Sequence, residues 1–335
     1  MAAASSALHS ASIVIDGVCP LLREPRYVDW YIEGGVTAAT PTVSLDEPAD
    51  VTLEAIGRWL RLIAADDRLR LARAAADIEA AKADGQLAIV MHFQGPGAIA
   101  KELDRIDAFK ALGVGMIQLT YNVKNPLGDG ACERTDAGLS NFGLAFIKRC
   151  NEARVIVDCS HTGIRTTLDA FEASSRPAVF SHANARALYD SPRNITDEQI
   201  SAAADSGGII GAVGFPGFLG PEPRPTLARF VEHIDYLVET AGIDHVGLGI
   251  DYYTGQHPVM DTEAAMARYQ WSVDCGRWDA DVYPPPPHYF PTDIETPRTL
   301  QALTAALSAR GYEPADIEKI LGGNWLRVFR EVWGA

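Results

Sequence analysis

Residues 245–251 read HVGLGID, a short apolar run that ends on an aspartate. Seven similar runs, rich in apolar and β-branched residues, precede it at 12–16, 36–43, 87–93, 115–121, 155–160, 178–182 and 208–215. Amphipathic stretches long enough for crossover helices separate them, for example 51–66, 106–112, 141–153 and 227–241. Eight strands that alternate with helices predict a parallel α/β fold closed into a (β/α)8 TIM barrel.

The same pattern argues against an open, doubly wound sheet. Such a sheet more often has fewer strands and a glycine-rich phosphate turn after the first one. No GxGxxG or GxxxxGK[ST] motif occurs in the sequence, so nucleotide binding has no support. Because the composition does not change before Gly255, we predict a single domain over residues 1–335.

The segment 252–297 follows the eighth predicted strand and differs from the rest of the chain. It contains Tyr269, Trp271, Trp278, Tyr283, Tyr289 and Phe290 and the run Pro284–Pro287. Loops of this length in compact domains are usually functional, so we expect a lid-like insertion over the mouth of the barrel. A packing or dimerisation insert is the alternative. Residues 313–333 are expected to form a closing helix against the barrel wall.

Charge and cysteine content limit the partners and the compartment. The chain has 29 Lys and Arg against 44 Asp and Glu, a net charge of −15, which disfavours nucleic acid and anionic membranes as partners. The five cysteines are scattered and form no CxxC pair, which argues against a disulfide framework or a thiolate zinc site. Residues 1–12 lack the basic and apolar regions of a secretory signal, and no run approaches a membrane span. We therefore expect a cytoplasmic protein.

Polar side chains stand where three of the predicted strands end. The fifth strand runs into Asp158-Cys159-Ser160-His161, the sixth ends in Ser181-His182 and the eighth ends in Asp251. Barrel enzymes build their sites at these strand ends, so His161, His182 and Asp251 are predicted to form a catalytic cluster. Two neutral imidazoles can hold a divalent cation that lowers the pKa of bound water, and a carboxylate such as Asp251 can take the proton.

Longer motifs carry a family resemblance. They are Ser160-His161, Ser181-His182 with Ala185–Leu188 and Pro192-Arg193-Asn194, then Gly247–Asp251, and finally Gly322–Val328. With these motifs the chain resembles the membrane (renal) dipeptidase family of the amidohydrolase superfamily. The resemblance implies a hydrolase with a TIM barrel of the metal-dependent type, and homodimers are common in the family. It also implies that His161 and His182 hold one zinc of a binuclear pair, that Asp251 shuttles the proton, and that Arg193 binds the substrate carboxylate.

Three departures from the family pattern affect the metal site. The first strand reads Asp16-Gly17-Val18-Cys19-Pro20, without the histidine and aspartate that bind the other zinc in the family. Gln94 stands where the bridging glutamate is expected, and Tyr121 replaces a histidine. A neutral amide is a poor bridge between two cations, so at most one metal ion is expected.

These departures leave three hypotheses open. One zinc or other divalent ion remains on His161 and His182, completed by water, by Gln94 or by His92, which alternation places on the same face as Gln94. Alternatively, the histidines, Asp251 and Tyr121 perform metal-free acid and base chemistry as a lyase or hydrolase, or the chain is a non-catalytic binding protein. The first is preferred: a dipeptidase-like hydrolase of an amide or related bond in a small carboxylate-bearing molecule. Asn122 and Tyr252 are further candidates for substrate contacts, and Tyr252 suggests an apolar or aromatic substrate.

Overall fold

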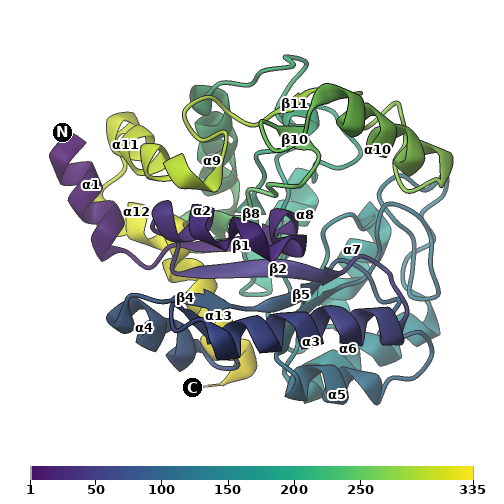
Figure 1. Ribbon diagram of the computed structural model, residues 1–335. Coiled ribbons are helices and arrows are strands. Elements are labelled where there is room, and N and C mark those ends of the chain that lie inside the picture. The colour runs from purple at the N-terminus through teal and green to yellow at the C-terminus, as the bar shows by residue number, and fades with distance from the viewer. Residues whose placement is uncertain (1, 335) are drawn as a thin grey trace.

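The computed structural model describes residues 2–334 and contains a curled sheet of parallel strands with helices outside it (Figure 1). The strands are β1 (Ile15–Cys19), β2 (Ala38–Ser44), β3 (Leu69–Leu71), β4 (Leu87–Ile89), β5 (Met91–Phe93), β6 (Val114–Gln118), β7 (Ile156–Asp158), β8 (Ile210–Ala212) and β9 (Val246–Leu248). The hydrogen-bonded strand order is β7-β6-β5-β2-β1-β9-β8. In it, β1 lies between β2 and β9. Two isolated bridges, Asp158 with Val179 and Phe180 with Ile210, link β7 to β8. The ring is therefore closed, which confirms the predicted TIM barrel.

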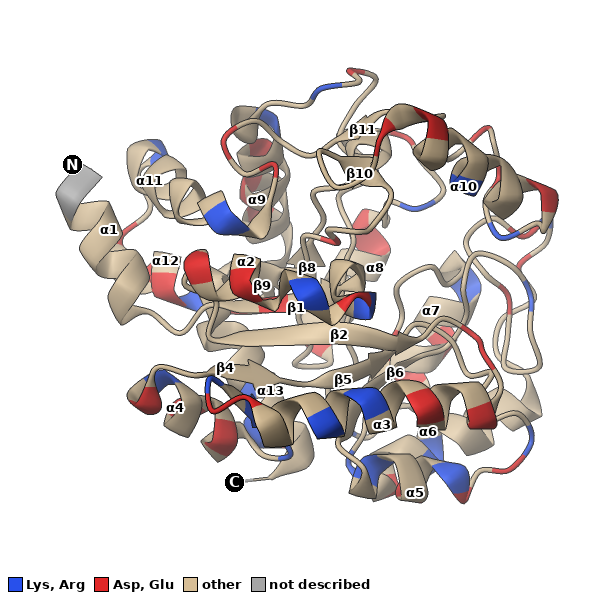
Figure 2. Ribbon diagram, viewed as in Figure 1, with Lys and Arg blue, Asp and Glu red and all other residues tan. Residues whose placement is uncertain are grey.

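Helices cover the outside of the ring, as the amphipathic stretches predicted. They are α1 (Ala2–Ala11), α2 (Val28–Glu33), α3 (Ala49–Ala65), α4 (Ala75–Asp84), α5 (Arg105–Ala111), α6 (Asn141–Ala153), α7 (Ile164–Ala173), α8 (Asp197–Asp205), α9 (Leu227–Ala241), α11 (Gln301–Arg310), α12 (Pro314–Glu318) and α13 (Asn324–Trp333). Asp and Glu residues occur along many of these helices (Figure 2), and among the described acidic residues only Asp16, Asp129 and Asp158 are buried, so the negative charge lies largely on the outer surface.

The closing helix α13 seals the end of the barrel at which the strands begin. One buried cluster joins residues from the strands, among them Ile15, Ala38, Met116 and Ile156, to Trp325 and Phe329 of α13. The indole of Trp325 donates a hydrogen bond to the carbonyl oxygen of Leu248 at 2.9 Å. A Cβ atom at Gly247 would lie 2.9 Å from that indole, so only glycine at this position leaves room for the Trp325 side chain. Since this end is filled, the opposite end of the barrel is left for a site.

Several element bounds differ from the predicted ones. The first strand begins at Ile15 rather than at residue 12, because residues 2–11 form α1. His9 holds that helix in place, with its ring nitrogens 2.7 Å from Thr304 Oγ1 and 2.9 Å from the carbonyl oxygen of Gly34. The predicted strand 87–93 is divided into β4 and β5, and β4 also pairs with β3, a strand that the sequence pattern did not indicate.

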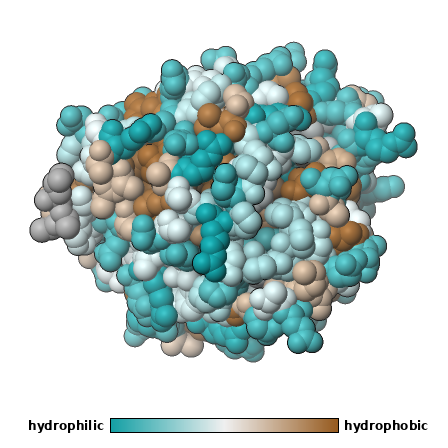
Figure 3. All heavy atoms as spheres, turned by 90° about the horizontal axis from the view of Figure 1, so that it is seen from above, coloured by the Kyte–Doolittle hydropathy of each residue, from teal (hydrophilic) through white to brown (hydrophobic). Residues whose placement is uncertain are grey.

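The segment 252–297 forms its own small structure beyond β9. It contains β10 (Gln256–His257), which pairs in parallel with β11 (His288–Tyr289), and α10 (Thr262–Asp274). In Figure 1 these elements lie at the upper right, on the side away from the C-terminus. From above, the surface shows separate apolar patches among hydrophilic side chains (Figure 3). Between residues 2 and 334 no helix has the length and apolar character needed to cross a membrane.

Candidate active site

The two predicted histidines meet at the ends of neighbouring strands. His161 Nε2 lies 2.8 Å from His182 Nε2, and both side chains are buried. The backbone of His161 has φ of +60°, and Asn122 and Asp251 at other strand ends have φ of +64° and +69°. Non-glycine residues adopt this left-handed region at a cost, and such residues cluster at functional sites.

The partner of each Nδ1 atom defines the tautomer of its ring. Asn122 donates its Nδ2 to the carbonyl oxygen of Arg277 at 2.9 Å, so its Oδ1 is the atom 2.7 Å from His161 Nδ1. An amide oxygen only accepts, and His161 Nδ1 must therefore donate. The Nε2 atom of neutral His161 is left with a free lone pair.

A buried carboxylate sets the tautomer of the second ring. Asp158 accepts the hydroxyl of Ser181 at 2.5 Å, so Ser181 Oγ accepts from His182 Nδ1 at 2.7 Å. Asp158 also accepts the backbone N–H groups of Ser160 and Ser181, each at 2.9 Å. Burial alone would raise the pKa of Asp158, but the hydrogen bond from His92, together with the one from Ser181, holds that pKa well below its usual value. Asp158 therefore remains an acceptor, and His182 Nε2 also carries a lone pair.

Two lone pairs that face each other at 2.8 Å repel, and a cation bound beside them to both nitrogens would remove that repulsion. Burial, and next the positive charge of Arg193, lower the pKa of both imidazoles well below the usual value, so a shared proton is disfavoured at neutral pH. Zinc binds imidazole nitrogen at about 2.0–2.1 Å, usually with the other ring nitrogen donating to an oxygen as both rings do here. The pair thus fits a divalent metal ion. Within residues 2–334 no third His, Cys, Asp or Glu completes a ligand group with them.

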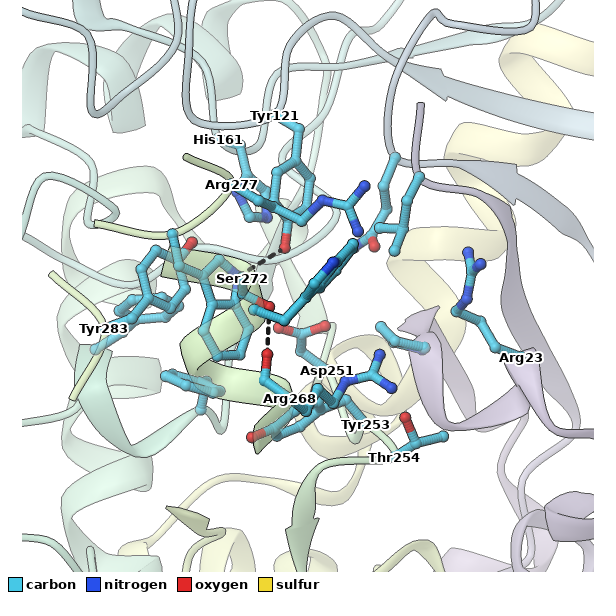
Figure 4. A pocket seen from close by; sticks show the side chains of 17 residues that line it. Arg23, Tyr121, His161, Asp251, Tyr253, Thr254, Arg268, Ser272, Arg277 and Tyr283 are labelled. Atoms are coloured by element: carbon cyan, nitrogen blue, oxygen red, sulfur yellow. Dashed lines mark hydrogen bonds between the residues drawn. The ribbon is translucent and has the colours of Figure 1, made fainter. Parts of the chain in front are cut away.

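A pocket opens beside His161. Of the predicted residues, it is lined by His161, Gln94, Tyr121 and Asp251. Tyr121 stacks on the His161 ring with centroids 4.1 Å apart, and its hydroxyl accepts a hydrogen bond from Trp278 Nε1 at 3.3 Å. Figure 4 shows the Asp251 carboxyl group and the Tyr121 hydroxyl directed into the same space.

The surroundings of Asp251 favour its protonated form. The carboxyl group keeps some contact with solvent through the pocket, but the enclosing protein raises its pKa to about 8 by desolvation, against the lowering effect of Arg193. The charge of Asp16 raises it further. A carboxyl group that titrates near neutrality can both take up and release a proton during turnover.

Arg193 and Asn122 lie behind the histidines rather than in the lining of this pocket. Arg193 is buried, donates from Nε to the hydroxyl of Tyr283 at 3.1 Å and stacks on Phe218 at 5.1 Å, while its Nη2 makes no hydrogen bond. Arg193 lines a second pocket that shares His161 with the first. The same Tyr283 hydroxyl accepts from Asn122 Nδ2 at 3.0 Å.

The candidates His92 and Tyr252 point elsewhere, as does Cys19 of the first strand. His92 Nε2 lies 3.1 Å from Asp158 Oδ2, so this ring contacts the carboxylate behind His182. Cys19 is buried against Asp16 and Thr40, and burial raises the pKa of its thiol well above the usual value. Tyr252 is buried, with its hydroxyl donating to the carbonyl oxygen of Ile294 at 2.7 Å; its neighbour Tyr253 lines the pocket instead.

The sequence reasoning missed the arginines of the pocket. Arg23, Arg268 and Arg277 line it, and the last two come from the segment 252–297 (Figure 4). The aromatic residues of that segment were the available signal, and Trp271, Trp278 and Tyr283 do line the pocket. No spacing or motif distinguished the arginines from surface residues.

The sequence matches the family described as "Membrane dipeptidase (Peptidase family M19)" over residues 32–271 and 287–334. A Klebsiella pneumoniae protein named "Uncharacterized protein in pqqA 5'region" is 32% identical over 298 residues, which cover 86% of this chain and 98% of that protein. The dipeptidase tcpJ of Claviceps purpurea is 28% identical over 269 residues, covering 79% of this chain and 56% of that protein.

Solved structures show the same fold. An amidohydrolase from Pseudomonas aeruginosa superposes with a TM-score of 0.88 at 31% identity, over 99% of both chains. A metallopeptidase from Rhodobacter sphaeroides, bound to a phosphinate mimic of the dipeptide L-Ala-D-Ala, gives a TM-score of 0.79 at 24% identity, over 96% of this chain and all of that one (100%).

Proposed function

This chain belongs to the membrane dipeptidase family, peptidase family M19, and from that membership we propose that it hydrolyses an amide or related bond of a small carboxylate-bearing molecule. The proposed site holds at most one divalent metal ion, zinc or another, on His161 and His182. The observation that carries the proposal is the pair of Nε2 atoms that face each other 2.8 Å apart beside the Asp251 pocket.

A divalent ion held by these imidazoles would lower the pKa of a bound water and polarise the scissile carbonyl group. In the proposed reaction, ionised Asp251 takes the proton of the attacking water and then gives it to the leaving nitrogen. Desolvation raises the pKa of Asp251 to about 8 and a divalent ion on the histidines would lower it, so a pKa between the ordinary value and 8 suits both halves of that transfer. Burial raises the pKa of Tyr121, so its phenol stays protonated and can donate a hydrogen bond to the oxygen that becomes negative.

The remaining residues position the reacting groups. Asn122, Ser181 and Asp158 hold the two rings in the tautomers that expose Nε2. Arg193 is the proposed contact for a substrate carboxylate, because its Nη2 lacks a partner and a guanidinium group suits a carboxylate. Gln94 lines the pocket and can supply a neutral oxygen to the ion or to the substrate.

The segment 252–297 is proposed to act as a lid, since much of the pocket wall comes from it. A closed lid would exclude water from the reaction. The cytoplasmic location, the single-domain organisation and the homodimer stay predictions.

The test is metal content together with hydrolysis. Purified protein would be stripped with chelator, titrated with zinc and assayed for release of free amino acid from dipeptides and N-acyl amino acids. We expect about one equivalent of zinc and zinc-dependent turnover, both lost in His161→Ala and His182→Ala. His257, which is exposed, provides the control His257→Ala. Full activity in stripped protein would instead support the metal-free hypothesis.

A further inference from the structure

The charges around the Asp251 pocket are unbalanced. Three guanidinium groups, those of Arg23, Arg268 and Arg277, line it, against the single carboxyl group of Asp251. Arg23 is already neutralised by an ion pair with Glu47 at 2.7 Å. Arg268 and Arg277 make no ion pair with any residue in the described range 2–334.

Arg268 and Arg277 bring two positive charges, without an ion pair to any described residue, into the wall of one pocket. Both side chains are partly buried, and burial lowers the pKa of Arg268. The charge of Arg277 acts on the carboxyl group of Asp46, but the two do not come within ion-pair distance. A desolvated charge without a partner costs free energy, and that cost is recovered when an anionic ligand binds. The two arginines therefore indicate a ligand anion in this pocket.

The pocket wall also has a large apolar part. Phe215 lies against Tyr253, Trp278 and Tyr283 with ring centroids 5.9–6.3 Å apart, and Trp278 and Tyr283 stack at 4.7 Å. Trp271 adds a further ring, covered by the guanidinium group of Arg277 at 5.1 Å. Aromatic walls of this kind bury an acyl chain, while the arginines bind the charged end of the ligand.

In the described part of the chain, the lining offers no carboxylate that is free to pair with an ammonium group. Asp251 is the only acidic side chain in it, and the proposed function uses that group for proton transfer. Gln94 presents a neutral amide. A dipeptide with a free amino terminus would bring a positive charge next to Arg268 and Arg277 and would find no anion to offset it.

We propose that the substrate is an N-acylated acidic amino acid, an amide with two carboxylates and no free amino group. This inference rests on the proposed hydrolysis. One carboxylate is bound by Arg268 and Arg277, with the acyl chain against the aromatic wall, and the other extends past His161 toward Arg193 in the adjoining pocket. In the reaction the C–N bond breaks, water supplies the oxygen of the new C–O bond, and the nitrogen leaves with a proton as the free amino acid.

Four compounds test separately the effect of the side-chain carboxylate and that of a free ammonium group. They are N-propionyl-glutamate, alanyl-glutamate, N-propionyl-glutamine and alanyl-glutamine, each in both configurations of the second residue. Calorimetry on the zinc-loaded protein reports KM for a compound that is turned over and Kd for one that is not. We expect N-propionyl-glutamate to have a KM or Kd at least about tenfold lower than alanyl-glutamate and N-propionyl-glutamine, which corresponds to about 1.4 kcal/mol.

The arginines are tested in the same assay. In the double variant Arg268→Gln/Arg277→Gln the preference for glutamate over glutamine should fall to about one, because the charge that selects the second carboxylate is gone. Arg298→Gln is the control, since Arg298 is bound to Glu33 outside the pocket and its loss should leave the preference unchanged.

Each outcome decides one of the two proposals. Tight binding of N-propionyl-glutamate without turnover supports the ligand class and contradicts the hydrolysis. Turnover with alanyl-glutamate preferred or equal supports hydrolysis and overturns the ligand class. Absence of heat with all four compounds at millimolar concentration overturns the ligand class as well, as does an unchanged preference in the double variant.

Discussion

Asn122 Oδ1 lies 2.7 Å from His161 Nδ1, and its amide is held in that orientation by the carbonyl oxygen of Arg277. Arg277 belongs to the segment 252–297, whereas His161 follows β7 in the barrel. The segment that covers the pocket therefore also fixes the tautomer of a proposed metal ligand. A change in its position would alter both substrate access and the basicity of His161 Nε2.

Replacing Asn122 by glycine should weaken zinc binding by about 10- to 100-fold, because His161 Nδ1 then loses its acceptor. Glycine tolerates the φ of +64° at this position, so backbone strain does not contribute. Asn122→Asp retains an acceptor and should keep zinc affinity at or above that of the wild type. Competition with a chromophoric chelator measures both. Equal zinc affinity in the wild type and Asn122→Gly would remove Asn122 from its positioning role.

The pH profile of kcat/KM reports the ionisation of Asp251. The first step needs the ionised carboxylate, so we expect kcat/KM to rise with pH along a limb that reports Asp251; desolvation raises this pKa to about 8, and a divalent cation on the histidines would move the limb to lower pH. Arg193 lowers that pKa, and Arg193→Gln should shift the limb to higher pH as well as raise KM. The exposed Arg165 provides the control Arg165→Gln. A limb that stays in place in Arg193→Gln, or that is unchanged in Asp251→Asn, contradicts the assignment.

The alternation of strand-like and helical stretches in the sequence was sufficient to predict the barrel. The histidines at the ends of the fifth and sixth predicted strands were sufficient to predict that His161 and His182 lie together. Strand order in a closed parallel ring brings the ends of consecutive strands together, so residues far apart in sequence share one edge. The candidate Tyr252 does not line the pocket: Asp251, just beyond β9, has φ of +69°, Tyr252 after it is buried, and Tyr253 lines the pocket instead. Periodicity cannot anticipate such a turn.

The position of Arg193, the arginines of the pocket and the helix α1 also could not be predicted from local sequence patterns. Arg193 was expected in the pocket, but the Tyr283 hydroxyl, 90 residues later in the chain, occupies its Nε. Arg268 and Arg277 lie in a segment without repeating pattern, where the sequence does not distinguish a pocket residue from an exposed one. The helix α1 depends on contacts of His9 with Gly34 and Thr304, which no local signal predicts.

Asp158 stabilises the fold beneath the histidines. Its buried carboxylate accepts two backbone N–H groups and the Ser181 hydroxyl, so Asp158→Asn should lower the free energy of unfolding by about 3 kcal/mol or more. Asp107→Asn, which breaks a partly exposed ion pair with Arg149, should cost less than about 1 kcal/mol.

The lowered pKa of Asp158 also predicts a pH dependence. A carboxyl group with a depressed pKa contributes stability that is present above its unfolded pKa of about 3.9 and is lost as the pH falls further. Urea unfolding at pH 3 to 7 should show this loss below about pH 4 in the wild type and less of it in Asp158→Asn. Parallel curves for the two proteins would contradict it.

Glycine at position 249 is required by the strand end that carries His182. A Cβ atom there would lie 1.8 Å from the carbonyl oxygen of Ser181 and 3.3 Å from Cα of His182. Gly249→Ala should therefore destabilise the protein by about 2 kcal/mol and weaken zinc binding, since the backbone that places His182 must shift. At Gly57, in α3, a Cβ atom would meet nothing within 4 Å, so Gly57→Ala should stabilise the protein by about 0.5–1 kcal/mol. Urea unfolding and zinc titration of both variants test the pair. Because Ser181 precedes His182 directly, normal stability and normal zinc affinity in Gly249→Ala would show that the close packing of these two strand ends does not set the position of the imidazole.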